Sequence, residues 1–186
     1  MDLLSGFVAW MLMIFMQACP AERLVAGDSY CYNLASQNKR VVIRVTGRKE
    51  KESWVALSAG VEESGSLDKA HFAVLSYGRN RTVTSFKEGT QELLSKPLPL
   101  PGLDKEILIS TASDYIFKRS KQPARAAAIK SVKGYNGAVK IKSARYEESQ
   151  DLIDVGTDAN LGLVYVAFTQ GGEVNGLELV EIKHKK

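Results

Sequence analysis

Residues 40–46 have the sequence Arg-Val-Val-Ile-Arg-Val-Thr, the clearest β-strand pattern in the chain. Its β-branched side chains favour an extended backbone, and polar Asn38-Lys39 and Gly47 bound it on either side. Similar short runs lie before and after it, roughly ten to fifteen residues apart. They span residues 29–34, 54–59, 72–77, 82–86, 106–110, 138–144, 161–170 and 177–182. This spacing predicts a mainly β fold, an antiparallel β-sandwich or a barrel-like domain.

One short helix is expected in this β-rich chain. Pro123 suits the first turn of a helix, Ala124–Val132 has high helix propensity, and Gly134 is a typical C-terminal stop. Residues 97–102 (Pro-Leu-Pro-Leu-Pro-Gly) favour a stiff polyproline II segment, which could divide the chain into two small domains at 97–104. Because each half alone would be small, we expect a single β-rich domain over residues 28–186.

The N-terminus carries an uncharged apolar run, Leu3–Met16. The run is shorter than the about 20 residues that a membrane-spanning helix needs. It fits the hydrophobic region of a signal peptide, which usually has about 7 to 15 residues. We therefore predict export, with residues 1–18 as a signal peptide and residues 19–27 as a tether.

The residues after this run indicate how the leader would be processed. Met16-Gln17-Ala18-Cys19 is similar to a bacterial lipobox, although Gln17 is less typical and no basic residue precedes the run. Lipidation at Cys19 would anchor the protein in a membrane, with the outer membrane preferred because Pro20 is not an aspartate. Cleavage after Ala21 is the alternative and would release a secreted protein. A short N-terminal core helix is disfavoured, since the run has no polar face.

Few residues suit catalysis or metal binding. The chain has two cysteines and two histidines. Cys31 and His71 could form a nucleophile–base pair, but a lone thiol is more often a small buried apolar group. Asp154, Asp158 and Asn160 could offer oxygens to calcium, but their spacing is not that of an EF-hand, and a turn between strands is favoured. We expect no enzyme activity, no metal and no cofactor.

Charge patterning is the most distinctive feature after the leader. Between residues 118 and 145 the chain has nine basic residues and no acidic one, whereas residues 147–158 are acidic without a base. The basic run predicts a docking surface for an acidic protein partner, and the net charge of +4 agrees with an acidic partner. A solvated surface whose charges pair with the acidic block is the simpler interpretation. A nucleic-acid partner is not expected, because few aromatic residues lie between the basic residues of this run. The basic run begins at Lys118. The residues predicted to bind the partner are the eight that come after it: Arg119, Lys121, Arg125, Lys130, Lys133, Lys140, Lys142 and Arg145.

Residues 19–24 (Cys-Pro-Ala-Glu-Arg-Leu) and 27–32 (Gly-Asp-Ser-Tyr-Cys-Tyr) resemble the start of small bacterial periplasmic lipoproteins of the type VI secretion immunity class. In those lipoproteins, a tether with an acidic residue followed by arginine and leucine leads into a strand that carries a second cysteine. The resemblance covers about the first quarter of the chain. It implies a periplasmic, lipid-anchored β-sandwich that binds and neutralises a toxin. The alternatives are an envelope hydrolase that uses Cys31 and His71, and a structural envelope lipoprotein.

Overall fold

The computed structural model describes residues 3–34, 38–49, 54–63, 66–67, 73–77, 81–112 and 115–186. Its helical elements are α1 (Leu3–Ala18) and the short 3₁₀ turn η1 (Ala21–Arg23). The first strands are β1 (Ser29–Leu34), β2 (Lys39–Lys49), β3 (Trp54–Glu63), β4 (Ser66–Leu67), β5 (Ala73–Tyr77), β6 (Thr82–Glu88) and β7 (Gln91–Glu92). The others are β8 (Leu98–Pro99), β9 (Glu106–Leu108), β10 (Ile116–Arg119), β11 (Lys142–Glu148), β12 (Asp151–Asp158), β13 (Gly162–Gln170) and β14 (Glu173–Lys183). The predicted mainly β, antiparallel fold is confirmed.

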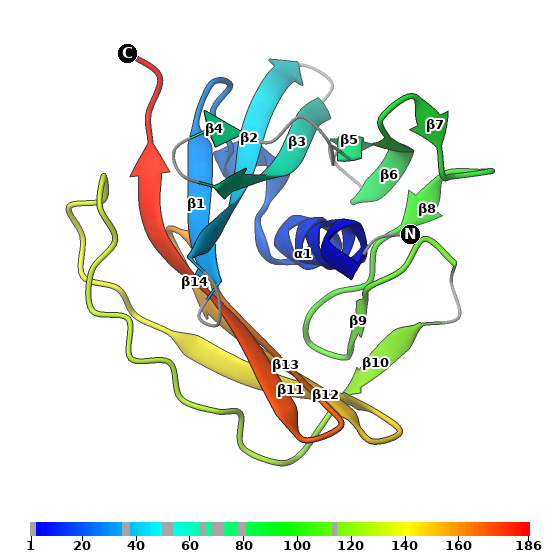
Figure 1. Ribbon diagram of the computed structural model, residues 1–186, viewed down its shortest axis with the longest axis vertical. Coiled ribbons are helices and arrows are strands. Elements are labelled where there is room, and N and C mark those ends of the chain that lie inside the picture. The colour runs from blue at the N-terminus through cyan, green and yellow to red at the C-terminus, as the bar shows by residue number, and fades with distance from the viewer. Residues whose placement is uncertain are drawn as a thin grey trace.

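The strands form one strongly curved sheet that surrounds α1 (Figure 1). Its order is β7-β6-β5-β3-β2-β1-β14-β13-β12-β11-β10-β9, with β4 added to β3 and β8 added to β6. Every strand pairing is antiparallel. Among the described residues no pairing joins β7 or β8 to β9, so the sheet is open between these two ends.

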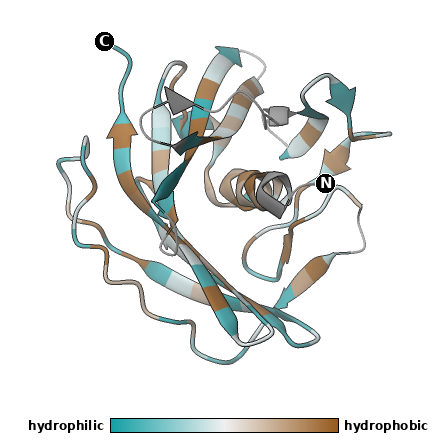
Figure 2. Ribbon diagram, viewed as in Figure 1, coloured by the Kyte–Doolittle hydropathy of each residue, from teal (hydrophilic) through white to brown (hydrophobic). Residues whose placement is uncertain are grey.

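Helix α1 fills the space that the sheet encloses. Every residue from Met11 to Gln17 is at most 2% exposed, so this part of the helix is buried on all sides. Figure 2 shows α1 mainly in the brown shades of apolar residues. Burial of an apolar side chain contributes about 1.5–3 kcal/mol, so the six residues Met11–Met16 together contribute on the order of 10 kcal/mol. That is as large as the whole net stability of an ordinary domain, about 5–15 kcal/mol.

This placement is the core-helix arrangement that the sequence pattern disfavoured. A helix without a polar face needs apolar neighbours on every side, and the curved sheet supplies them. Cleavage of residues 1–18 stays a prediction, but it would remove the centre of this core. Within the described part of the chain, no helix is both long enough and apolar enough to cross a membrane.

Aromatic residues of β1 pack the sheet against α1. Successive side chains of a strand point to opposite faces, so Tyr30 and Tyr32 both point inward. Their rings pack edge-on against Phe15, with centroid separations of 5.2 and 6.5 Å. The buried Tyr32 hydroxyl donates to the Leu163 carbonyl at 2.8 Å, which ties the inner face of β1 to β13.

The helix predicted after Pro123 is wrong, and the strand predicted at 138–144 is displaced to β11, Lys142–Glu148. Residues 123–132 form no helix; they cross the outside of the sheet as an irregular segment. Isolated helices this short are marginal, and the Arg125 N–H bonds instead to Asp154 of β12. The acidic stretch that includes Asp154 is also not a turn, because it forms the buried strand β12.

Candidate docking surface

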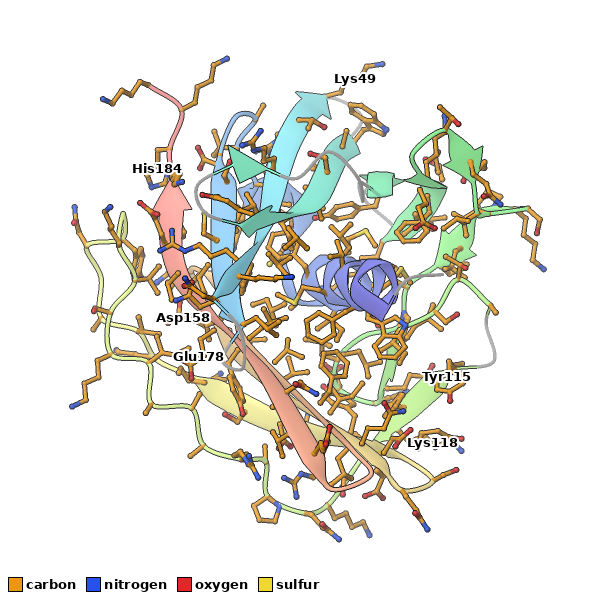
Figure 3. All side chains as sticks on the ribbon, viewed as in Figure 1. Lys49, Tyr115, Lys118, Asp158, Glu178 and His184 are labelled. Carbon is orange, nitrogen blue, oxygen red and sulfur yellow. The ribbon has the colours of Figure 1, made fainter. Side chains whose placement is uncertain are left out.

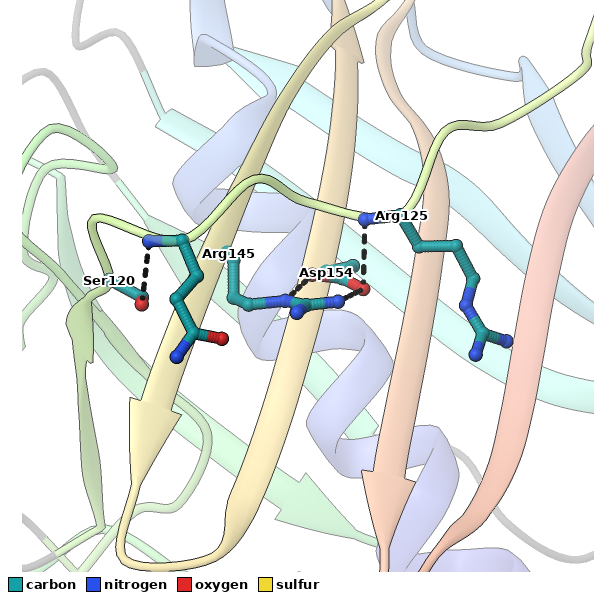
Figure 4. A network of polar contacts seen from close by, with 5 residues as sticks. Ser120, Arg125, Arg145 and Asp154 are labelled. Carbon is teal, nitrogen blue, oxygen red and sulfur yellow. Dashed lines mark hydrogen bonds and ion pairs between the residues drawn. The ribbon is translucent and has the colours of Figure 1, made fainter.

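The segment that connects β10 to β11, residues 120–141, is named the strap here. It has almost no regular structure and runs across the outer face of β11, β12, β13 and β14 (Figures 1 and 4). Loops of this length without secondary structure are uncommon in compact domains and are usually functional. The strap is therefore the first place to look for a functional surface.

Asp154 anchors the first part of the strap. This carboxylate is 2% exposed and points outward from β12, where it accepts the Arg125 backbone N–H at 3.1 Å. It also accepts two hydrogen bonds from the Arg145 guanidinium, at 2.7 and 2.8 Å (Figure 4). These bonds raise the pKa of Arg145. The Ser120 N–H donates to the Arg145 backbone carbonyl at 2.8 Å, so the backbone of β11 holds the start of the strap and the Asp154 carboxylate holds it at Arg125.

Asp158 anchors the end of the strap. It is 5% exposed and accepts backbone N–H groups of Lys140, Asn160 and Leu161 at 2.7, 2.8 and 3.1 Å. Burial alone would raise its pKa, but the hydrogen bonds outweigh burial and the pKa is lowered. The carboxylate therefore stays ionised and keeps this end of the strap in place at neutral pH.

The middle of the strap is joined to β14. Lys133 donates its N–H to the Val180 carbonyl at 3.0 Å, and its carbonyl accepts the Ile182 N–H at 2.8 Å. Its ammonium lies 3.1 Å from Glu181. The preceding Val132 is 2% exposed and packs into the core cluster. Lys133 thus forms a single parallel β-bridge with Glu181 of β14.

Gly134 follows at a point where only glycine fits. Its φ is +85°, and a Cβ there would lie 2.0 Å from the Ile182 carbonyl oxygen. The sequence pattern interpreted Gly134 as the stop of a helix. The structural reason for glycine is instead the close approach of the strap to β14.

The strap and its flanking strands present most of the predicted basic residues to solvent. Arg119 lies on β10 beside Lys118, and Lys142 and Arg145 lie on β11. Arg145 is half-buried and paired with Asp154, and Lys133 is held by Glu181. Within the described residues, the remaining cationic groups form no ion pair within 4.0 Å and are exposed: Lys118, Arg119, Lys121, Arg125, Lys130, Lys140 and Lys142.

The acidic block does not neutralise these cations. Asp154 and Asp158 each accept one backbone N–H of the strap, and of the basic side chains only Arg145 pairs with either of them in the described part of the chain. The carboxylates therefore fix the path of the strap while its own basic side chains stay free. The simpler interpretation, in which the two charge blocks cancel, holds for Arg145 alone.

The cysteines are both buried. Cys19 is 3% exposed, and its sulfur accepts the Leu163 N–H at 3.3 Å. Burial raises the pKa of the Cys19 thiol to about 12. Cys31 is 0% exposed, and burial raises its pKa as well. His71, the proposed base for Cys31, lies outside the described residues.

The calcium interpretation finds no geometric support among the described residues. They contain no group of three or more histidine, cysteine, aspartate or glutamate side chains that could hold a metal ion. Asp158 does end β12 beside the turn at Asn160, as the alternative interpretation expects, whereas Asp154 lies within the strand.

Sequence reasoning assigned no contact to His184. The ring Nδ1 lies 3.0 Å from the Asp28 carboxylate, and Nε2 lies 3.0 Å from the Gly134 carbonyl oxygen. Asp28 is 156 residues away in the chain, so no local pattern reveals the pair. Only the antiparallel register of β1 and β14, with Ser29 opposite Lys183, brings the two residues together.

Comparisons with known proteins add little to this description. No protein-family model matches the chain, and no curated protein matches it. The structure is similar to the 2.0 Å structure of the hypothetical protein CT021 from Chlamydia trachomatis, with 13% sequence identity and a TM-score of 0.46. The match covers 91% of this chain and 92% of that one. At this level of similarity nothing is transferred from one protein to the other.

Proposed function

We propose that this chain is a binding protein that docks an acidic protein partner on the strap and its flanking strands. The observation that carries the proposal is a set of seven exposed cationic groups that have no ion pair within the described residues. Four of them lie on the strap, which the sheet fixes at several points, and three lie on the flanking strands β10 and β11. A fixed set of like charges on one face attracts an oppositely charged surface and orients it. The finer version of the proposal, which comes from the resemblance of residues 19–32, is that the partner is a secreted toxin.

Pre-organisation is the physical reason why the strap suits this role. A flexible basic tail would lose conformational freedom on binding, which weakens the affinity. The strap is already ordered by Asp154, Asp158 and β14, so a partner need not order its backbone. The cost of binding is then limited to the long side chains and to the desolvation of the charges.

Lipid tethering through Cys19 is a competing proposal, which the buried position of this cysteine opposes. An acylated cysteine must be reachable by the modifying enzyme and must leave the protein core. Cys19 is buried, and a Cβ on Gly162 would lie 2.3 Å from its sulfur, so the space around it is filled. Tethering would require α1 and the sulfur of Cys19 to leave their places in the core.

Charge reversal tests the docking proposal. The variant Lys121→Glu, Arg125→Glu, Lys130→Glu changes three exposed strap residues and spares Lys133 and Arg145, whose ion pairs hold the fold. The matched control reverses three exposed lysines elsewhere: Lys87→Glu, Lys96→Glu, Lys186→Glu. Both variants have the same net charge, so any difference between them reports the position of the charges.

The two variants and the unaltered protein serve as baits in a nuclease-treated soluble extract, and immobilised poly-glutamate serves as a defined probe. We expect the unaltered protein and the control to retain the same acidic protein and the polymer, and the strap variant to lose both. Added salt should weaken the binding, since exposed charges are screened. Equal retention by the strap variant and the control would show that the strap is not the docking surface.

A further inference from the structure

His184 makes a bridge between three parts of the chain. His184, labelled in Figure 3, lies in the segment after β14. Asp28 precedes β1, and Gly134 belongs to the strap. Asp28 is 5% exposed and also accepts the Lys185 N–H at 3.3 Å. The strap is therefore held at Gly134 by a side chain whose other ring nitrogen contacts a nearly buried carboxylate.

The two partners of the ring determine its protonation state. A carboxylate and a carbonyl are both acceptors, so both ring nitrogens of His184 have to donate. Neutral imidazole has one N–H, whereas imidazolium has two. The arrangement is complete only when the ring is charged. The Gly134 carbonyl and then Asp28 raise the pKa of His184 above its usual value of 6.5, although burial lowers it slightly.

Loss of the proton has a defined structural consequence. The neutral ring keeps its N–H on Nδ1, because an unprotonated Nδ1 would face the Asp28 carboxylate. Nε2 then presents a lone pair to the Gly134 carbonyl oxygen, and that contact becomes repulsive. The contact with Asp28 is retained and the contact with the strap is lost.

The other charged groups around this bridge do not replace the ring. On the strap, the ammonium of Lys133 is already 3.1 Å from Glu181 of β14, and Lys183 lies 4.0 Å from the same carboxylate. On the segment before β1, Asp28 is the carboxylate that contacts the ring, and Lys185 approaches it through its backbone. Within the described residues, no further side chain donates to the Gly134 carbonyl oxygen.

We propose that His184 is a proton-dependent fastener, meaning that only its protonated ring holds the strap at Gly134. In this way it regulates the basic docking surface. The part concerning docking rests on the proposed function, whereas the fastener itself does not. Below pH 6.5 the fastening is fully present; as the pH rises through the raised pKa of His184 it is lost. Partner binding should weaken over the same range, because the strap becomes less pre-organised.

Hydrogen exchange in a single-histidine protein tests the fastener. The variant His71→Gln leaves His184 as the sole histidine of the chain, so its ring titration can be followed by NMR without overlap. The reporters are the backbone amides of Lys133 and Ile182, whose hydrogen bonds join the strap to β14 next to Gly134. The internal control is the Arg125 backbone amide, which donates to the Asp154 carboxylate. The second variant, His184→Gln in the same background, cannot change its charge.

We expect the protection factors of Lys133 and Ile182 to fall about fivefold or more as His184 loses its proton, a change typical of coupled sites. The Arg125 amide should not follow this titration, and His184→Gln should abolish it. Protection factors that do not change with pH, or that change equally in His184→Gln, would overturn the fastener. Binding of poly-glutamate is measured in parallel; a working fastener without any binding would refute the docking proposal alone.

Discussion

The side-chain amide of Gln17 pairs with both backbone groups of Leu108. Its Nε2 donates to the Leu108 carbonyl at 2.6 Å, and its Oε1 accepts the Leu108 N–H at 2.9 Å. These are the two bonds that a neighbouring strand would make with the free edge of β9. One residue of α1 thus closes the edge at which the sheet ends, and it joins the helix to the sheet by direct hydrogen bonds.

The first prediction concerns this pair. Gln17→Leu should lower the free energy of unfolding by about 2–4 kcal/mol, because it leaves two buried backbone groups of Leu108 without partners. Met16→Leu in the same helix turn keeps the volume and should cost less than about 1.5 kcal/mol. Urea denaturation measures both. Equal effects of the two variants would mean that Gln17 contributes volume and not hydrogen bonds.

A second prediction separates the two roles of Asp154. Arg145→Met should destabilise the fold by about 3–5 kcal/mol, because it leaves a carboxylate that is 2% exposed without its cation. The double variant Arg145→Met, Asp154→Leu should be more stable than Arg145→Met, since no unpaired charge remains. The double variant also loses the acceptor for the Arg125 N–H, so its strap should be cut faster by trypsin. Additive effects would contradict a coupled pair.

A third prediction concerns Gly134. Gly134→Ala should displace this part of the strap, because a Cβ would lie 2.0 Å from the Ile182 carbonyl oxygen at a φ of +85°. Limited trypsin digestion at the strap lysines should accelerate at least several-fold. Gly171→Ala is the matched control, since Gly171 also has a positive φ but nothing within 4 Å of the added atom. If both variants are cleaved at the same rate, the close approach does not matter.

A fourth prediction concerns the thiols. The thiolate is the reactive form of cysteine, and burial raises the pKa of Cys19 to about 12 and that of Cys31 above its usual value. Iodoacetamide at pH 8 should therefore add no label to the folded protein and two labels in denaturant, as counted by mass spectrometry. Rapid labelling of Cys31 in the folded state would instead support the hydrolase alternative.

Strand positions were the part of the fold that local pattern could predict. The runs at 29–34 and 82–86 coincide with β1 and most of β6, because β-branched and alternating residues favour extended backbone wherever they occur. Within the run at 97–102, Leu98 and Pro99 form β8 against β6. Its prolines cannot donate to a further strand, which suits the end of a sheet.

Long-range packing was the part that local pattern could not predict. An apolar run of this length fits a signal peptide and a fully buried helix equally well, and the sheet that surrounds α1 is assembled from residues far away in the chain. The helical composition of Ala124–Val132 was outweighed by contacts with Asp154 and β14. The docking residues were predicted as a charge block, but their fixed path and the His184 fastener follow only from the register of the sheet.

The central claim is that α1 is the core of the folded domain and that everything on the outside of the sheet depends on it. The intact mass of the natively folded protein, purified from soluble and membrane fractions of a bacterial host, tests this claim most directly. We predict a mass that includes residues 3–18 and carries no lipid in the folded material. A folded protein that begins at an acylated Cys19, or at Glu22 after cleavage, would contradict the claim.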